Sequence, residues 1–328
     1  MRRRIALWQE AGGGPIGAGA VGGGMDEAAS TGGRMLILGA TSLIGRYLTP
    51  RLATMGGDVT ALSRSPRAAQ DGVRWVLADL QAPDSLAAVG RVDTVYSLSP
   101  IWLLTPQALA ALGALGMRRL VAFSSTSVLT KAASGSSAER RVAEALARGE
   151  AAIEAHAAVS GMGWTILRPT LIYAEGQDGN VSRLAGLIRR CGVLPLPGNG
   201  AGRRQPVHAE DLARLAEAVM ARPATNRAYA APGGETLSYR TMVERIFAGL
   251  GRRPLILSVP EPVIRFGYAL AGPLLPGSTA QMIERIAEDL VFDGEDAQRD
   301  FAWTPRAFHP RFGGALSSAE TTRNSASS

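Results

Sequence analysis

Short apolar runs recur along the first half of the chain, separated by segments that favour helix. The runs lie at residues 35–38, 58–63, 73–77, 93–99, 120–124 and 164–168. Helices are predicted between them, most clearly over residues 43–52, 105–115 and 138–158. Strands that alternate with helices in this way predict an α/β fold with a doubly wound parallel sheet. The right-handed crossover rule places the carboxyl ends of these strands along one edge of the sheet.

The second half of the chain mixes shorter elements and predicts a smaller α+β lobe. Its helices are predicted at residues 181–190, 209–220, 238–247 and 279–290, and its strands at 203–208 and 226–230. We therefore expect a first domain at 34–170 with parts of 203–232, and a substrate or partner lobe at 171–202 and 233–310. Residues 1–33 and 311–328 have the composition of disordered tails. Met25 and Met35 lie close to the first strand, which raises the hypothesis of a start downstream of Met1.

The first apolar run leads into a glycine turn, Gly39-Ala-Thr-Ser-Leu-Ile-Gly45, and then into a helix. The free N–H groups and the positive dipole end of such a helix suit a pyrophosphate. Gly39 permits the tight turn, and Gly45 permits close packing of helix on strand. Ser42 takes the middle position of the usual three-glycine pattern, so a glycine turn without a ligand is the alternative.

Polar side chains at the strand ends indicate one shared ligand. They are Ser42, Arg64, Asp79, Ser99 and Ser125. In a dinucleotide fold the end of the second strand lies beside the adenosine ribose, and an arginine there suits a 2′-phosphate. Arg64 therefore favours NADP(H), with NAD(H) as the other cofactor to consider and a solvated loop arginine as the alternative. Asp79 either faces the adenine or caps a helix that begins near Pro83.

Composition narrows the class of protein. Apolar residues make up 46% of the chain, and no apolar run approaches the ~20 residues that span a bilayer, so a soluble cytoplasmic protein with no membrane span is expected. The single cysteine, Cys191, excludes an internal disulfide and a cysteine-built metal site, and we expect a buried free thiol and no metal. The formal net charge is +7, but the arginines are scattered, which argues against nucleic-acid binding.

Over roughly residues 35–310 the chain resembles the extended, atypical short-chain dehydrogenases/reductases of the NAD-dependent epimerase/dehydratase family. The matching motifs are Gly39–Gly45, Phe123–Val128, Ile166–Pro169 and Gln205–Ala213. The resemblance implies a Rossmann-type, NAD(P)-binding first domain. It implies cofactor contacts from Gly39, Ala40, Thr41, Ser42, Leu43, Ile44, Gly45, Ser63, Arg64, Asp79, Leu80, Leu98, Ser99, Ser124 and Pro169.

The family's catalysis, as the resemblance implies it, uses a Ser or Thr, a Tyr and a Lys in a Tyr-x-x-x-Lys helix. Ser125 matches the first role. The family's spacing places the tyrosine at Val142 and the lysine at Leu146, and neither side chain can do that chemistry. Tyr96 and Tyr173 follow strand ends and are the substitute proton donors, with half-buried packing tyrosines as the alternative.

Two functions remain in competition. The first is an NADP(H)-dependent oxidoreductase, or a sugar-nucleotide epimerase or reductase, that lacks the usual pair. The second is a non-catalytic NADPH-binding sensor or accessory subunit, similar to NmrA or to the nucleotide-binding subunit of respiratory complex I. A small-molecule substrate, such as a sugar nucleotide, would meet Arg203, Arg204 and His208, although surface arginines and a structural histidine fit as well. Family members often form homodimers, which the Ala- and Leu-rich helices permit.

Overall fold

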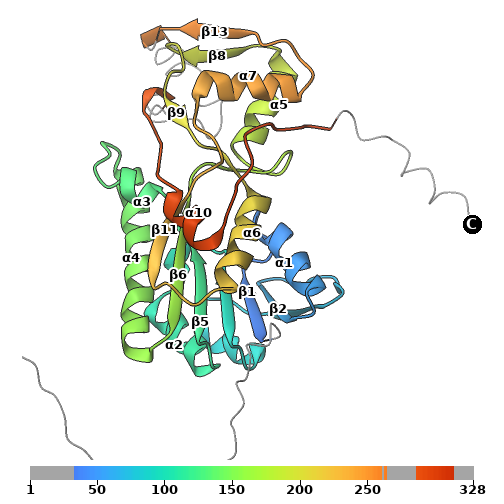
Figure 1. The fold of residues 1–328 in the computed structure, drawn as a ribbon, viewed down its shortest axis with the longest axis vertical. Helices are drawn as coiled ribbons and strands as arrows, with labels where there is room; N and C mark the ends of the chain where they lie inside the picture. Colours follow the sequence, from blue (N-terminus) through green and yellow to red (C-terminus); the bar gives the residue numbers. More distant parts are fainter. Residues whose placement is uncertain (1–32, 261, 264–285, 314–328) are drawn as a thin grey trace, which may run out of the picture. The chain divides into compact units, whose positions relative to one another are not determined.

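The structure is a computed structural model that describes residues 33–260, 262–263 and 286–313. Its central sheet has seven strands in the order β11-β6-β5-β4-β1-β2-β3, and every pairing in it is parallel. The strands are β1 (Arg34–Leu38), β2 (Asp58–Ser63), β3 (Val73–Leu77), β4 (Thr94–Ser97), β5 (Arg119–Phe123), β6 (Gly163–Pro169) and β11 (Arg227–Ala231). The predicted doubly wound sheet is confirmed (Figure 1).

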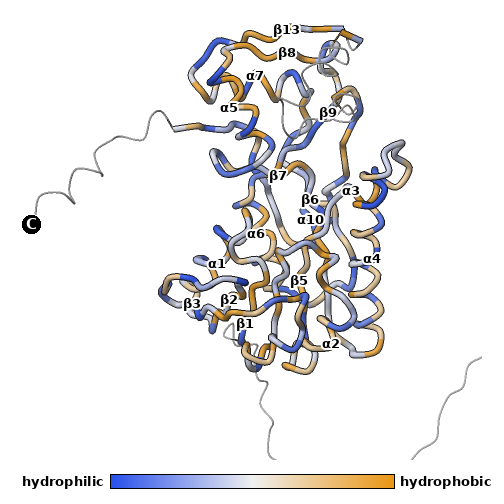
Figure 2. The backbone as a smooth tube through the Cα atoms, turned by 180° about the vertical axis from the view of Figure 1, so that it is seen from behind, coloured by the Kyte–Doolittle hydropathy of each residue, from blue (hydrophilic) through white to orange (hydrophobic). Residues whose placement is uncertain are grey.

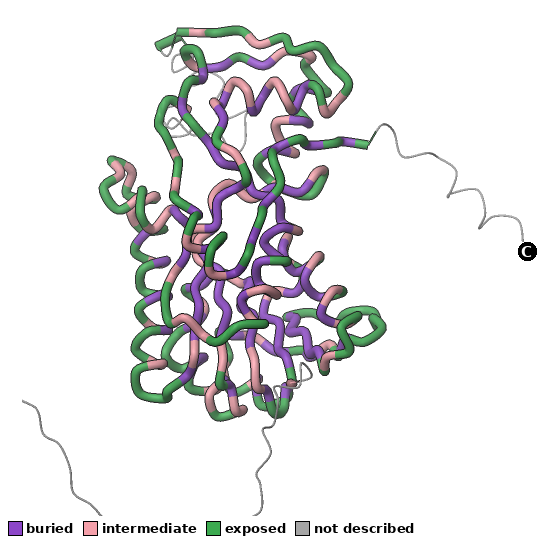
Figure 3. The backbone as a smooth tube through the Cα atoms, in the orientation of Figure 1, coloured by how far each residue is buried: buried purple, intermediate pink, exposed green. Residues whose placement is uncertain are grey.

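Two helical layers cover the sheet, because successive residues of each strand point to opposite faces. In β1, Leu36 and Leu38 belong to one buried cluster and Ile37 to the other. The first face carries η1 (Pro83–Val89), η2 (Ile101–Leu103), α2 (Pro106–Ala114) and α4 (Ser137–Ser160); the second carries α1 (Gly45–Thr54), α6 (Ala209–Met220) and α10 (Glu295–Phe301). Figure 2 colours most of the central strands as hydrophobic, and Figure 3 shows them largely buried.

A third buried cluster forms the lobe. Its core includes Tyr173, Ile188, Val243 and Phe308. The lobe elements are α5 (Val181–Cys191), β8 (Leu194–Pro197), β9 (Arg203–Arg204), β12 (Leu237–Ser238), α7 (Tyr239–Gly249) and β13 (Ile256–Val259). The pair of β7 (Ile172–Tyr173) and β10 (Val207–His208) connects the lobe to the sheet side, since Tyr173 belongs to the lobe cluster and Val207 to the cluster that contains α6. One further short helix, α3 (Ser127–Thr130), follows β5.

The C-terminal segment joins both parts. Residues 295–303, which the sequence assigns to the lobe, pack instead on the sheet side. Phe301 and Trp303 belong to the buried cluster that packs α1, α6 and α10 on the sheet, called the α6 cluster below. The Trp303 indole donates a hydrogen bond of 2.9 Å to the Asp211 carbonyl. Phe312, expected in the tail, is buried in the lobe core. The predicted helix 279–290 and both tails lie mostly outside the described residues.

Three local predictions have a definite outcome. Ser238 caps α7 as expected, because its hydroxyl accepts the Thr241 amide at 3.0 Å. The segment after Pro83 is a 3-10 helix, and Asp79 does not cap it, because its carboxylate accepts the amide of Gln81. Cys191 is free but exposed, so the buried thiol was a wrong prediction; it lies at the last position of the amphipathic helix α5.

Candidate functional site

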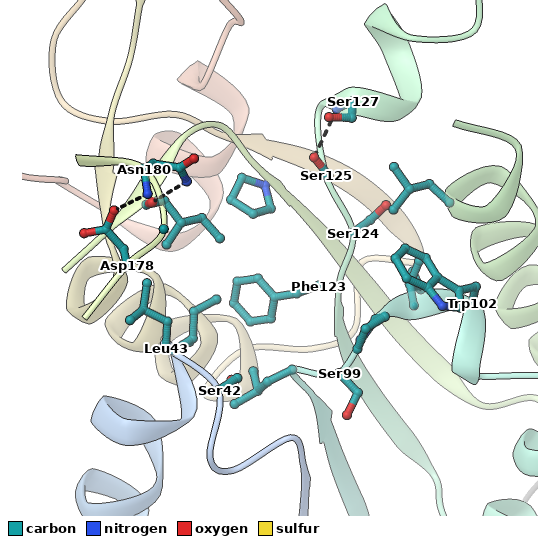
Figure 4. A pocket seen from close by; sticks show the side chains of 18 of the residues that line it. Ser42, Leu43, Ser99, Trp102, Phe123, Ser124, Ser125, Ser127, Asp178 and Asn180 are labelled. Carbon is teal, nitrogen blue, oxygen red and sulfur yellow. Dashed lines mark hydrogen bonds between the residues drawn. The ribbon is translucent and has the colours of Figure 1, made fainter. Parts of the chain in front are cut away.

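A pocket of about 610 Å³ opens at the carboxyl edge of the sheet, where the crossover rule places the ligand site. Figure 4 shows Leu43 and Asp178 on one side of it, with Ser124 and Trp102 on the other. Nine of its lining residues were predicted as cofactor or catalytic residues: Thr41, Ser42, Leu43, Ile44, Leu98, Ser99, Ser124, Ser125 and Pro169. The pocket therefore joins the glycine turn to the serines after β5.

The glycine turn is shaped by close backbone contacts. Gly39 has φ +77°, and a Cβ there would lie 2.8 Å from the Ser99 amide nitrogen. A Cβ on Gly45 would lie 2.6 Å from the Gly39 carbonyl oxygen. The Ser42 hydroxyl accepts the Gly45 amide at 3.2 Å, so the residue at the middle position of the motif satisfies one donor of the first helical turn. Within the described part of the chain, the amides of Leu43 and Ile44 have no protein acceptor and remain available to an anion.

The two serines after β5 differ in their hydrogen bonds. Ser124 donates its hydroxyl proton to Glu150 at 2.5 Å, and the same carboxylate pairs with Arg168 at 2.5 and 2.9 Å. Ser125 instead accepts the Ser127 amide at 3.1 Å, a bond drawn in Figure 4. Its own hydroxyl proton therefore remains available to a ligand, whereas that of Ser124 does not.

Helix α4 supplies an apolar wall. Val142, Leu146 and Glu150 follow one another at four-residue spacing on one helix face, and the first two line the pocket. Val142 is 38% exposed, and Leu146 is buried. Gly149 lets α4 approach η2 closely, since a Cβ there would lie 2.7 Å from the Ile101 backbone. The positions at which the family spacing expects tyrosine and lysine thus face the pocket, but they carry hydrocarbon.

The loop before α5 closes the opposite side of the pocket and holds its one carboxylate among the described lining residues, Asp178. That carboxylate accepts the amides of Asn180 and Ser182 and the Ser182 hydroxyl, so it orders the start of α5. Arg46 lines the same side and donates to the Gln177 amide oxygen at 2.9 Å. The pocket therefore presents hydroxyls, but its acidic group is already saturated with hydrogen bonds.

Neither predicted substitute tyrosine reaches this pocket. Tyr96 is 1% exposed within the α6 cluster, and burial raises the pKa of its hydroxyl far above the ordinary value. Tyr173 is equally buried, packs edge-on against His208 and Phe308, and has its pKa raised by burial. Tyr96 lies within β4 and Tyr173 within β7, and both aromatic side chains fill buried clusters, so the structure places neither of the proposed proton donors in the pocket wall.

The predicted substrate residues of the lobe form hydrogen bonds and ion pairs with other residues of the protein. His208 accepts the Glu210 amide through Nδ1 and meets Glu175 at 3.1 Å through Nε2, which fixes the start of α6. Arg203 pairs with Asp289 at 2.8 Å. Arg204 is buried, donates to main-chain carbonyls and lies over the Tyr239 ring. All three are absent from the pocket lining.

The other predicted cofactor residues lie outside the pocket wall. Gly39, Ala40 and Gly45 form the back of the turn, while Ser63, Arg64, Asp79 and Leu80 lie at the ends of β2 and β3. At the end of β2, Arg67 donates to the Ser63 hydroxyl at 3.2 Å, and Arg64 is exposed. The β2 end thus offers guanidinium groups and no carboxylate between residues 63 and 67.

Sequence reasoning missed half of the pocket wall. The missed residues are Arg46, Pro100, Ile101, Trp102, Phe123, Ser127, Ile172, Gln177, Asp178, Gly179 and Asn180. Residues 100–102 follow the β4 end, so extending the strand-end rule by one turn would have found them. The residues from 177 to 180 come from a loop of the lobe whose packing the sequence does not encode locally.

No group of three or more His, Cys, Asp or Glu residues suited to a metal occurs in the described residues. Each helix in that same part of the chain is too short or too polar to span a bilayer.

Comparison with known families gives the site its context. Residues 35–231 match the model of the NAD dependent epimerase/dehydratase family, which covers more than half of the chain. The chain belongs to this family. Membership confirms the resemblance drawn from the sequence motifs, and the matched residues carry both the glycine turn and Ser125.

One curated relative of this family member is named 3-diazoavenalumate denitrifying reductase, from a Streptomyces species. The two proteins are 28% identical over 233 residues, which cover 58% of this chain and 73% of the relative.

Solved structures share the fold of this family member. MoeE5 in complex with UDP-glucuronic acid and NAD superposes with a TM-score of 0.62 at 22% identity, over 84% of this chain and 95% of that one. The epimerase Mth375 of Methanothermobacter thermautotrophicus gives 0.66 at 17% identity, over 84% and 88%. The UDP-glucose 4-epimerase of Thermotoga maritima with UDP-glucose gives 0.62 at 14%, over 84% and 94%.

Proposed function

We propose that this family member is a nicotinamide-dependent reductase that works without the Tyr-x-x-x-Lys pair. The observation that carries the proposal is the pocket that joins the glycine turn to the free hydroxyl of Ser125, with Val142 and Leu146 in its wall in place of acid–base groups. A reductase fits this pocket because hydride transfer depends on orientation of the two reactants, which an apolar wall provides.

The chain's residues fit a dinucleotide. The unpaired amides of Leu43 and Ile44 would hold the pyrophosphate, and the absence of a Cβ at Gly39 leaves the backbone accessible there. NAD is present in the solved structure of MoeE5, which supports a nicotinamide cofactor here. We propose NADP(H) over NAD(H), because Arg64 at the β2 end is exposed and makes no hydrogen bond or ion pair with a described residue.

When bound, the cofactor supplies a hydride. Ser125 donates its hydroxyl proton to a heteroatom of the acceptor and so holds the acceptor in place. Val142 and Leu146 exclude water from the α4 side of the pocket. Asp178 is engaged within its own loop, because its oxygens accept the hydrogen bonds that start α5. Any proton that the product needs therefore comes from solvent.

The curated relative supports a reaction of this kind. Its name describes the reductive loss of nitrogen from a diazo compound. When an aryl diazonium group is reduced by a hydride equivalent, the C–N bond breaks, a C–H bond forms and N₂ leaves, so the positive charge is cancelled and no proton is consumed. Such an electrophile needs no tyrosine, which agrees with the hydrocarbon at residues 142 and 146.

Binding and turnover test the proposal on the full chain. Calorimetry with NADPH and NADH is expected to show binding, tighter for NADPH. A screen of electrophilic carbonyl, enone and diazo compounds, followed by loss of NADPH absorbance, is expected to find a substrate. For that substrate, Ser125→Ala should lower kcat/KM by about 2–10-fold, which corresponds to the loss of one neutral hydrogen bond. The matched change Ser160→Ala, at an exposed serine that does not line the pocket, serves as the control.

A sensor or accessory role is the alternative outcome. Tight NADPH binding with no oxidation of NADPH by any compound in the screen would favour the sensor, and lack of binding to either dinucleotide would refute both readings.

A further inference from the structure

We propose that the pocket receives a planar aromatic electrophile stacked on Trp102, and that it is not built for a sugar nucleotide. The inference rests on the proposed reductase function and names its substrate class. It is carried by the juxtaposition of Trp102 on η2 and Val142 on α4, two exposed apolar side chains that face the same pocket.

The exposure of these two side chains is the first argument. Trp102 is 43% exposed and Val142 is 38% exposed, although both line a concave site. Exposed apolar surface inside a pocket gains stability when a ligand covers it, and an indole face favours an aromatic ring in offset or edge contact. Gly149 fixes the arrangement, because its missing side chain lets α4 lie directly against the η2 backbone.

The polar groups complete the recognition pattern. Ser125 offers one hydroxyl proton, which suits a single acceptor atom conjugated to the ring. Arg46 is the one cationic side chain among the described lining residues, and it lies on the side opposite Trp102 near Gln177. One guanidinium can attract a single carboxylate at the far end of a flat substrate.

A sugar nucleotide would require more. Its diphosphate carries two adjacent charges, for which the sequence offered Arg203 and Arg204. The structure commits Arg203 to Asp289 and Arg204 to main-chain carbonyls and the Tyr239 ring, and neither lines the pocket. The wall formed by Leu146 and Val142 likewise offers no hydrogen bond to a sugar hydroxyl.

Calorimetry on the full chain saturated with NADP⁺ tests the inference with two probes, 4-hydroxycinnamate and UDP-glucose. We expect 4-hydroxycinnamate to bind and UDP-glucose to give no heat over the same range. Trp102→Ala should weaken 4-hydroxycinnamate binding by about tenfold, and Trp102→Phe should retain most of the affinity. Trp75→Phe, a matched change at a tryptophan outside the pocket, should leave it unchanged.

The outcomes separate the two proposals. Absence of binding to NADP⁺ and NADPH alike would remove the proposed function itself. If dinucleotide binds, the substrate class is overturned by UDP-glucose binding in preference to 4-hydroxycinnamate, by no binding of either probe, or by equal affinity of the wild type and Trp102→Ala for 4-hydroxycinnamate. Circular dichroism and NADP⁺ affinity equal to those of the wild type are expected for both Trp102 variants and show that they are folded. Trp102→Phe is the conservative second variant, which keeps the test available if Trp102→Ala does not fold.

Discussion

The buried ion pair between Glu150 and Arg168 offers the sharpest test of what stabilises the ends of β5 and β6 beside the pocket. The Glu150 side chain is 8% exposed and that of Arg168 is 23% exposed, and two hydrogen bonds of 2.5 and 2.9 Å join them. Glu150→Gln keeps the shape and an acceptor for Ser124 but leaves the guanidinium without its counter-charge. Loss of one partner of a buried pair costs about 3–5 kcal/mol, and the partial exposure of Arg168 reduces our expectation to about 2–3 kcal/mol.

Equilibrium urea denaturation of the full chain measures this cost. The ion pair between Arg51 and Glu217 is the matched control, because its arginine is 39% exposed and solvent screens it more strongly. We expect Glu217→Gln to cost at most about 1 kcal/mol. Arg168→Met combined with Glu150→Gln should cost less than the sum of the two single changes, by about 1 kcal/mol or more. Equal costs for Glu150→Gln and Glu217→Gln, together with additive single changes, would refute the reasoning.

Three further predictions follow from contacts elsewhere. Gly39→Ala must strain a backbone of φ +77° and place a methyl group 2.8 Å from the Ser99 amide, so it should lower stability by about 1–3 kcal/mol and weaken NADPH binding in calorimetry; an unchanged dinucleotide affinity would contradict the assignment of the turn. Arg64→Gln should weaken NADPH binding by about tenfold and leave NADH binding unchanged; equal losses for both cofactors would place Arg64 elsewhere. Burial raises the pKa of Glu175, but its hydrogen bonds with His208 and main-chain amides outweigh this effect and hold the pKa below the ordinary 4.5. The contribution of Glu175 to stability is therefore complete above about pH 4.5 and is lost as the pH falls through the lower pKa of the folded protein. Glu175→Gln should therefore flatten the acid side of a plot of the unfolding midpoint against pH.

The fold was predictable because its signals are local. Apolar runs of four to seven residues, most of them followed by segments that favour helix, specify buried parallel strands, and the glycine turn specifies the first crossover. From these the topology rules place the ligand at the carboxyl edge, which is where the pocket lies. The same rule correctly brought Ser42, Ser99 and Ser125 together, although they are far apart in sequence.

Side-chain direction and pairing were not predictable in this way. Tyr96 lies within β4 and Tyr173 within β7, whereas Ser125 follows β5. Whether a residue near a strand end points into the core or into the pocket depends on strand register and on the helix above it. The roles of Arg203 and His208 depend on Asp289 and Glu175, which are distant in sequence and carry no motif. Long-range polar partners of this kind are set by tertiary packing, which a single sequence does not display.

The inner face of α4 shows that structural and catalytic constraints on one helix can separate. Val142, Leu146 and Glu150 lie on the same stripe, yet the glutamate still forms its buried ion pair while the first two positions carry hydrocarbon. Glu150 supports β5 through Ser124 and β6 through Arg168, so its removal would destabilise the sheet edge whatever chemistry the pocket performs. Residues 142 and 146 bear no such structural bond, so their side chains can follow the needs of the ligand. Because α4 retains the Glu150 ion pair but carries apolar side chains at residues 142 and 146, the site is retained while the ligand that it can accept is altered. We therefore expect this chain to differ from the neighbours that bind sugar nucleotides in its substrate more than in its cofactor.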